Sequence, residues 1–172
     1  DPVRYDWRNG GGHLAASASG VLVYGPGEPS SSEYYLSWSD RDGRIVRVSD
    51  TPRAFRDVKV GPDGRRVATV IGTSTEGDLW LVDATGTLSR LTFSLSPHRP
   101  TWTKRGDGIT VGAGKDGRWR LLTVPVEGKR NSTVLLESSH RLYPNSWSPD
   151  GRHLIFQESR TDTGWDLRVL EV

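Results

Sequence analysis

The sequence contains no cysteine and no methionine among its 172 residues. The absence of cysteine excludes disulfides, thiol nucleophiles and thiolate metal sites, and leaves either an oxidising or a reducing compartment open. The chain begins Asp1-Pro2, so we expect it to be a piece of a longer product. No apolar run approaches the roughly 20 residues that a membrane helix needs, which predicts no direct membrane insertion.

The sequence also lacks a strong excess of either charge. The formal net charge is +2 with both signs interspersed, and no long basic tract indicates nucleic acid. Hydrophobic residues make up only 34%, although Trp 7 and Tyr 5 supply large apolar areas. The counts of Gly 20 and Pro 10 imply many turns. This composition favours an all-β chain of short strands.

A repeat of 43 or 44 residues organises the chain. Four predicted tight turns end in a glycine, at Gly20, Gly64, Gly108 and Gly151. The clearest two copies end in Pro-Asp-Gly, in which Pro pre-sets φ, the Asp side chain caps the turn and Gly takes the positive φ. Two further markers recur 43 residues apart: Asp40-x-x-Gly43 with Asp83-x-x-Gly86, and Arg47-Val48-Ser49 with Arg90-Leu91-Thr92.

Each repeat unit divides into four short runs rich in Val, Ile, Leu and Trp. In the second unit the predicted strands are 57–60, 66–71, 78–83 and 88–93. Four strands in about 40–45 residues is the size of one propeller blade, and blades must stack because one cannot bury its faces alone. The sequence therefore predicts a single β-propeller domain over 1–172, with four four-stranded antiparallel blades near 13–50, 54–94, 98–137 and 142–172.

The last unit ends at its third strand, Trp165–Val172. At the other end Val3, Tyr5 and Trp7 alternate with polar residues, as in a half-buried strand. One prediction is that Asp1–Trp7 completes the last blade and closes a four-blade ring without an exposed edge. The alternative is a partial propeller whose edges are paired by a second chain, and a homodimer of two half-rings is one form of it.

Two segments resemble the TolB-type (WD-repeat-like) β-propeller family. Trp147-Ser148-Pro149-Asp150-Gly151 resembles its repeat turn, and Asp78-Leu79-Trp80-Leu81-Val82-Asp83 resembles the next part of the repeat. The likeness covers nearly the whole chain and is greatest to propeller regions attached to bacterial serine/threonine kinases. It implies a sensor or interaction module of a bacterial extracytoplasmic protein, periplasmic or at the cell surface. The first unit lacks the Pro-Asp-Gly turn, and the family usually has about six blades where this chain has four units.

No catalytic or metal-binding constellation is visible. There is no Gly-x-Ser-x-Gly elbow, the histidines form no metal-binding pair, and Asp40–Gly43 lacks the downstream acids of a calcium loop. We therefore predict no catalytic residue, no metal and no cofactor. Acids that face each other across a channel would instead indicate a glycosidase or lyase, and that alternative stays open. The acidic candidates are Asp57, Glu76, Asp78, Glu158 and Asp166.

One set of basic residues recurs in the loops that lead into the first strand of successive units. Such loops gather at one mouth of a propeller channel, where a basic rim suits a protein, an acidic peptide or a small acidic ligand. The predicted rim consists of Arg53, Arg56, His98, Arg99, His140 and Arg141. Repeated loops also inherit repeated residues, so ordinary solvated side chains are the simpler reading of the same pattern.

The tryptophans are predicted to be structural. Trp102 and Trp147 precede the turns and are assigned to packing between blades, and Trp80, Trp119 and Trp165 are assigned to the core. The sequence thus favours a non-enzymatic binding module. A purely architectural spacer and a propeller enzyme are its alternatives.

Overall fold

The computed structural model of the chain describes residues 33–73, 75–127 and 131–172, together with the backbone of residues 5–6, 11–12, 14–16 and 22–24. Within these ranges every regular element is a β-strand, and no helix could span a membrane. The strands form antiparallel sheets of two to four strands. The all-β prediction is therefore confirmed.

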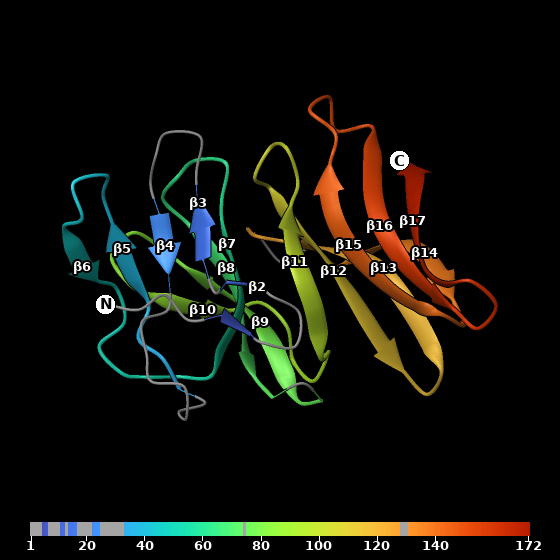
Figure 1. Cartoon of the computed structure of the whole chain (residues 1–172), viewed down its shortest axis with the longest axis horizontal. Coiled ribbons are helices and arrows are strands. Elements are labelled where there is room, and N and C mark those ends of the chain that lie inside the picture. The colour runs from blue at the N-terminus through green and yellow to red at the C-terminus, as the bar shows by residue number, and fades with distance from the viewer. Residues whose placement is uncertain are drawn as a thin grey trace.

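Four sheets follow one another along the chain (Figure 1). The first contains β3 (Leu14–Ala16), β4 (Leu22–Tyr24), β5 (Ser37–Ser39) and β6 (Ile45–Arg47). The second contains β7 (Phe55–Val60), β8 (Val67–Gly72), β9 (Gly77–Val82) and β10 (Leu88–Arg90). The third contains β11 (Pro97–Trp102), β12 (Gly108–Lys115), β13 (Arg118–Pro125) and β14 (Thr133–Ser138). The fourth contains β15 (Arg141–Trp147), β16 (His153–Arg160) and β17 (Gly164–Glu171).

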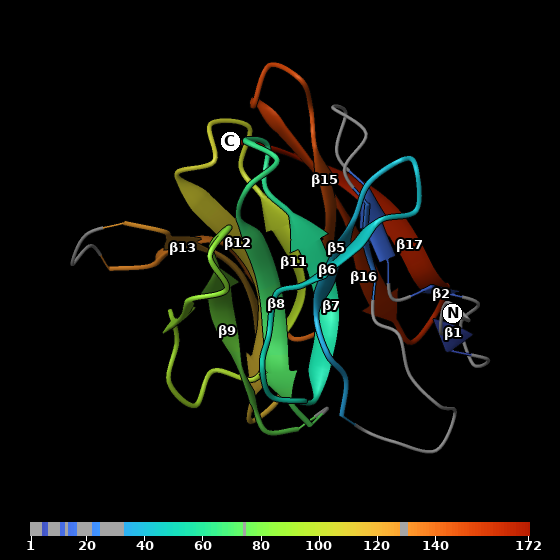
Figure 2. The ribbon, with the colours of Figure 1, turned by 90° about the vertical axis from the view of Figure 1, so that its left-hand side faces the viewer.

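The sheets stack through their faces. The first strands of successive sheets contact each other, β3 with β7, β7 with β11 and β11 with β15. The view along the longest axis places the second and third sheets one behind the other (Figure 2). A separate hydrophobic core fills each of the three junctions, and its members come from the two sheets on either side. The most buried members are Leu36, Val67, Leu79, Ile109, Leu121 and Leu154.

Burial along a second strand reflects how many neighbours its sheet has. In β12 the run from Gly108 to Ala113 is buried without alternation, because the third sheet has a neighbour on both faces. In β16 buried Leu154, Phe156 and Glu158 alternate with more exposed residues. Among the described residues the fourth sheet therefore has one covered face and one open face.

The repeated turns are closed by aspartate side chains, as predicted. Asp63 Oδ1 accepts hydrogen bonds from the backbone N–H groups of Arg65 and Arg66, at 2.9 and 3.1 Å. Asp150 Oδ1 accepts from the Arg152 N–H at 3.0 Å and from the Ser148 hydroxyl at 2.5 Å. In the turn between β11 and β12 the left-handed glycine is Gly106, with φ of 69°, and not the predicted Gly108, because Asp107 and Gly108 extend that turn. Gly20 lies outside the described residues.

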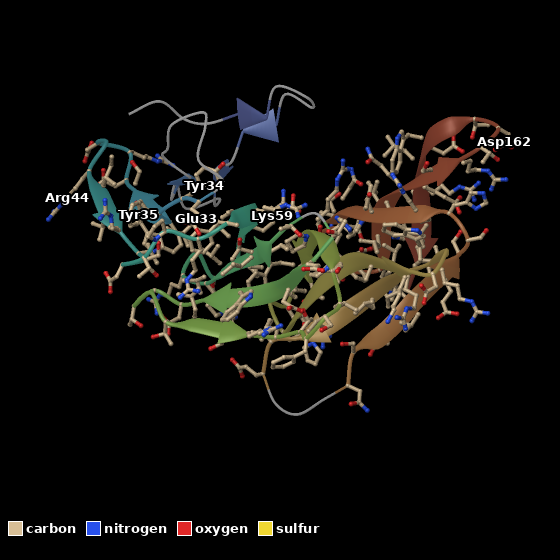
Figure 3. The ribbon with its side chains drawn as sticks, turned by 90° about the horizontal axis from the view of Figure 1, so that it is seen from below. Glu33, Tyr34, Tyr35, Arg44, Lys59 and Asp162 are labelled. Atoms are coloured by element: carbon tan, nitrogen blue, oxygen red, sulfur yellow. The ribbon has the colours of Figure 1, made fainter. Side chains whose placement is uncertain are left out.

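The predicted ring closure is not formed by the described residues. β1 (Tyr5–Asp6) pairs with β2 (Gly11–Gly12) in a two-stranded sheet, and β17 is the last strand of its sheet. The first and fourth sheets lie at opposite ends of the longest axis (Figure 1). The side-chain view shows the same separation, with Arg44 near one end and Asp162 at the other (Figure 3). The other residues of Asp1–Trp7 lie outside the described part of the chain.

Candidate functional site: a groove across the second, third and fourth sheets

The first strands of three sheets each contain a β-bulge near their middle. The strand register shifts between Arg56 and Lys59, between His98 and Thr101, and between Pro144 and Ser146. Asp57 and Arg99 both have a φ of 49°, which is uncommon for residues with a side chain. Bulges bend a strand and redirect its side chains, and they are frequent beside functional sites.

A groove of about 1050 Å³ lies beside these bulged strands. Its walls come from the second, third and fourth sheets and from the loop after β10. Cationic and aromatic side chains dominate the part formed by the third and fourth sheets. They are His98, Lys115, Trp119, Arg141 and Tyr143.

The aromatic rings form one continuous cluster. His98 lies 5.8 Å from Trp119 and 5.5 Å from Tyr143 between ring centroids, and Trp119 meets Tyr143 edge-on at 5.7 Å. Tyr143 also stacks on Trp165 at 5.2 Å. Trp165 is 51% exposed, so its assignment to the core was wrong. The rings thus extend from the groove to the open face of the fourth sheet.

Two arginines cover this cluster. The Arg99 guanidinium lies 4.9 Å from the Tyr143 ring centroid, and it donates a hydrogen bond to Gln157 Oε1 in the fourth sheet. Its left-handed backbone also brings the Arg99 N–H within 3.5 Å of Asp57 Oδ2. The Arg141 guanidinium lies 6.0 Å from the Trp119 ring centroid. Each arginine thus places a cation beside an aromatic ring, and this combination suits anionic and planar groups.

The environment of His98 disfavours its charged form. Partial burial lowers the pKa of His98 below its ordinary value of 6.5, and the positive charges of Arg56, Arg141 and Arg99 lower it further. The carboxylate of Asp57 acts in the opposite direction and does not reverse the shift. His98 is therefore neutral at pH 7 and contributes a ring and a hydrogen-bonding nitrogen to the groove.

The structure brings together four of the six predicted rim residues. Arg56, His98, Arg99 and Arg141 are close enough for the three arginines to affect the pKa of His98. Arg56 also donates a hydrogen bond to the Thr73 carbonyl.

The other two rim residues have different surroundings. Arg53 forms a β-bridge with Tyr34 of the first repeat unit. The His140 Nδ1 lies 3.9 Å from Glu158 Oε1, and its backbone N–H donates to the Ser138 hydroxyl at 3.0 Å. Lys115 and Tyr143 complete the groove without having been predicted, because neither occupies the repeated basic loop position.

Two acidic residues, Glu76 and Asp78, line the groove. The Asp78 carboxylate accepts hydrogen bonds from Arg90 and, at 3.0 Å, from the Thr92 hydroxyl. No group of three or more potential metal ligands occurs in the part of the chain that the structure describes.

The stacked sheets are similar to the blades of TolB-like β-propellers. No protein-family model matches the chain. Over 125 residues it is 25% identical to the Tol-Pal system protein TolB of Francisella tularensis subsp. tularensis, a match that covers 69% of this chain and 29% of that protein. The same protein from subsp. holarctica is 26% identical over the same length. The chain thus spans less than a third of these bacterial relatives.

Solved structures show the same fold. TolB from Acinetobacter baumannii superposes with a TM-score of 0.76 at 13% identity, covering 100% of this chain and 41% of that one. A putative TolB from Agrobacterium tumefaciens gives 0.71 at 20% identity, with 92% and 60% covered. One of two prolyl endopeptidases, which are enzymes, gives 0.70 at 17% identity, with 88% and 26% covered. The fold therefore occurs in TolB proteins and also in an enzyme, so the fold alone does not assign a function.

Proposed function

We propose that this chain is a non-enzymatic, protein-binding part of a β-propeller that acts outside the cytoplasm. The likeness to Tol-Pal system proteins supports the class and the location. The proposal extends to a partial propeller, because the first and fourth sheets lie far apart (Figure 1). A link to a kinase domain is a further part of the proposal and rests on the sequence resemblance alone.

The partner surface that the groove fits best is an acidic, extended segment with aromatic or aliphatic side chains. One observation carries this assignment: cations from separate strands lie in or beside one groove, next to partly exposed rings. Lys115 and Arg141 line it, and Arg99 lies over the ring of Tyr143. Carboxylates would pair with the cations, and apolar side chains would lie against the rings.

A double substitution tests this site. The probe is a short fluorescent peptide in which Glu alternates with Phe, and binding is followed by anisotropy. Arg99→Ala together with Arg141→Ala should weaken binding about tenfold, since each partly desolvated ion pair contributes on the order of 0.5–1 kcal/mol. The control is Arg105→Ala with Arg152→Ala, which removes the same charge from exposed positions that do not line the groove.

The two variants separate specific binding from general attraction. Full affinity in the double groove variant would remove the groove as the binding site. Equal losses in both double variants would mean that the peptide responds only to net charge, and that result would also reject the site.

A further inference from the structure

The groove has an acidic side chain at the end that the second sheet forms. Glu76 lies between β8 and β9 and lines the groove. The residue is exposed, and among the described residues its carboxylate forms no ion pair and no hydrogen bond. The groove therefore has a carboxylate at one end, whereas Lys115 and Arg141 contribute cations from the third and fourth sheets.

The second acid of the groove, Asp78, is already neutralised. The residue is buried, its carboxylate is paired with Arg90, and it accepts a hydrogen bond from the Thr92 hydroxyl at 3.0 Å. Its charge is thus balanced within the second sheet. Glu76 is then the negative charge at this end that a ligand can reach.

Hydrogen bonds hold the turn that carries Glu76. The Thr73 N–H donates to the Glu76 carbonyl at 2.7 Å, and the Glu76 N–H donates to the Thr73 hydroxyl at 3.0 Å. From outside the turn, Arg56 donates to the Thr73 carbonyl, and the Ser96 hydroxyl donates to the Thr75 carbonyl at 2.6 Å. These bonds use the backbone of Glu76 and leave its carboxylate available. A charge held in place by its surroundings can discriminate between ligands.

The positive side chains lie over the next two sheets. Lys115 ends β12 in the third sheet, and Arg141 begins β15 in the fourth. Arg99 adds a third cation at this end, over the ring of Tyr143. Within the described ranges no carboxylate forms an ion pair with any of these three side chains. They are therefore available to acidic groups of a ligand.

The order of the sheets sets the spacing of these charges. The second, third and fourth sheets follow one another in the stack, and packed sheets lie about 10 Å apart. An extended chain advances about 3.3 Å per residue, so about three residues lead from one sheet to the next. A segment that crosses all three sheets would meet Glu76 first, Lys115 about three residues further on, and Arg141 about six residues further on.

We propose that Glu76 sets the direction in which a partner segment lies in the groove, by pairing with a Lys or Arg of that segment. The partner segment then has a basic residue over the second sheet and acidic residues about three and six positions along. An aromatic or aliphatic residue between the two acids lies against Trp119 and Tyr143. A segment laid the other way brings like charges together at both ends, and this repulsion rejects it. Glu76 acts in this way only if the groove binds a protein segment, so the assignment rests on the proposed function.

Two fluorescent peptides test this role of Glu76. The first is Lys-Ala-Ser-Glu-Phe-Ala-Glu with both ends blocked, and the second has Glu in place of its Lys. By anisotropy the wild-type chain should bind the first peptide about fivefold more tightly, because a repulsive pair replaces an attractive one in the second. In Glu76→Lys the preference should reverse, since the second peptide now forms the attractive pair.

Glu137→Lys is the matched control. Glu137 is exposed in β14 and does not line the groove, and the substitution changes the net charge by the same amount. This variant should keep the preference of the wild-type chain for the first peptide. Binding of the second peptide by Glu76→Lys also shows that this variant is folded, as expected because backbone groups hold its turn.

The outcomes separate failure of this role from failure of the proposed function. Equal affinity of the wild-type chain for the two peptides would overturn the role of Glu76, and so would a preference that reverses equally in Glu76→Lys and Glu137→Lys. The proposed function predicts in addition that both peptides bind more weakly to the Arg99→Ala, Arg141→Ala variant. If that variant binds both peptides as the wild-type chain does, or if neither peptide binds the wild-type chain saturably, the groove itself is rejected.

Discussion

Thr92 explains at the residue scale why a hydroxyl recurs at one position of the repeat. Its side chain accepts from the Leu79 N–H and donates to Asp78, and the residue is 7% exposed. Thr92→Val keeps the shape and leaves both partners short of a hydrogen bond, so unfolding free energy should fall by about 1–3 kcal/mol. Urea denaturation measures this. Thr133→Val on an exposed strand position is the control and should change little.

His98 links the groove to pH through its lowered pKa. Above pH 6.5, the ordinary pKa of histidine, the ring is neutral in both the folded and the unfolded chain. In that range His98 therefore adds no pH dependence to the free energy of unfolding. As the pH falls below that value the unfolded chain binds the proton first, and the folded state is destabilised.

The corresponding prediction uses His98→Phe, which keeps a ring against Trp119 and Tyr143. The difference in unfolding free energy between variant and wild type should shift in favour of the variant as the pH is lowered from 7 through 6 and below. Denaturation curves at each pH provide the measurement. A difference that stays constant over this range would contradict the assigned shift.

Residue types alone indicated the turns, because Pro, Asp and Gly act through their own backbone preferences. They did not indicate the backbone of Arg99, whose φ of 49° depends on a bulge set by pairing with β12. They also did not indicate that His140 lies beside Glu158, a residue of β16. Long-range pairing decides both features, and a periodic pattern does not contain it.

At the scale of elements, the close approach of β12 and β15 depends on a glycine. A Cβ placed on Gly112 would lie 2.1 Å from the Leu142 carbonyl oxygen, and backbone cannot move aside as a side chain would. Gly112→Ala should therefore force the third and fourth sheets apart and lower unfolding free energy by about 1–3 kcal/mol.

Gly117→Ala is the matched substitution that separates this contact from the intrinsic effect of alanine. A Cβ added at Gly117 would have open space around it, although the φ of 76° adds local strain. Thermal unfolding of both variants, with tryptophan fluorescence to follow the junction, should show the larger shift in Gly112→Ala. A larger shift in the Gly117 variant would mean that backbone strain, and not contact between sheets, controls stability here.

The sequence predicted where strands occur more reliably than it predicted which residues those strands contact. The predicted run 88–93 contains β10 (Leu88–Arg90), but Leu91 and Thr92 cap β9 by other hydrogen bonds. Trp102 and Trp147 were correctly assigned to junctions: the Trp102 indole N–H donates to Lys59 O at 3.0 Å, and that of Trp147 to Thr110 Oγ1 at 3.1 Å. The assignment of Trp165 to the core was wrong, because the fourth sheet has a described neighbour on only one face.

For the whole molecule, the distinguishing feature is the open face at the end of the stack. Leu167 and Val169 are 70% and 65% exposed, whereas Leu121, in the equivalent position to Leu167 one sheet earlier, is fully buried. The residues that precede these leucines do not separate them, since Trp and then a charged residue come before each, at 119–120 and at 165–166. The difference arises only from what stacks beside each sheet.

Leu167→Lys tests whether this face is open in solution. In the stack described here the lysine would extend into water, so unfolding free energy should change by less than about 0.5 kcal/mol and the monomer mass should persist. The same substitution at Leu121 would bury a charge and should prevent folding. If a closed ring or a second copy covered the face, Leu167→Lys would instead cost several kcal/mol or shift the mass, because the buried apolar contact would be lost. Sedimentation and urea denaturation of the two variants distinguish an open stack from a covered one.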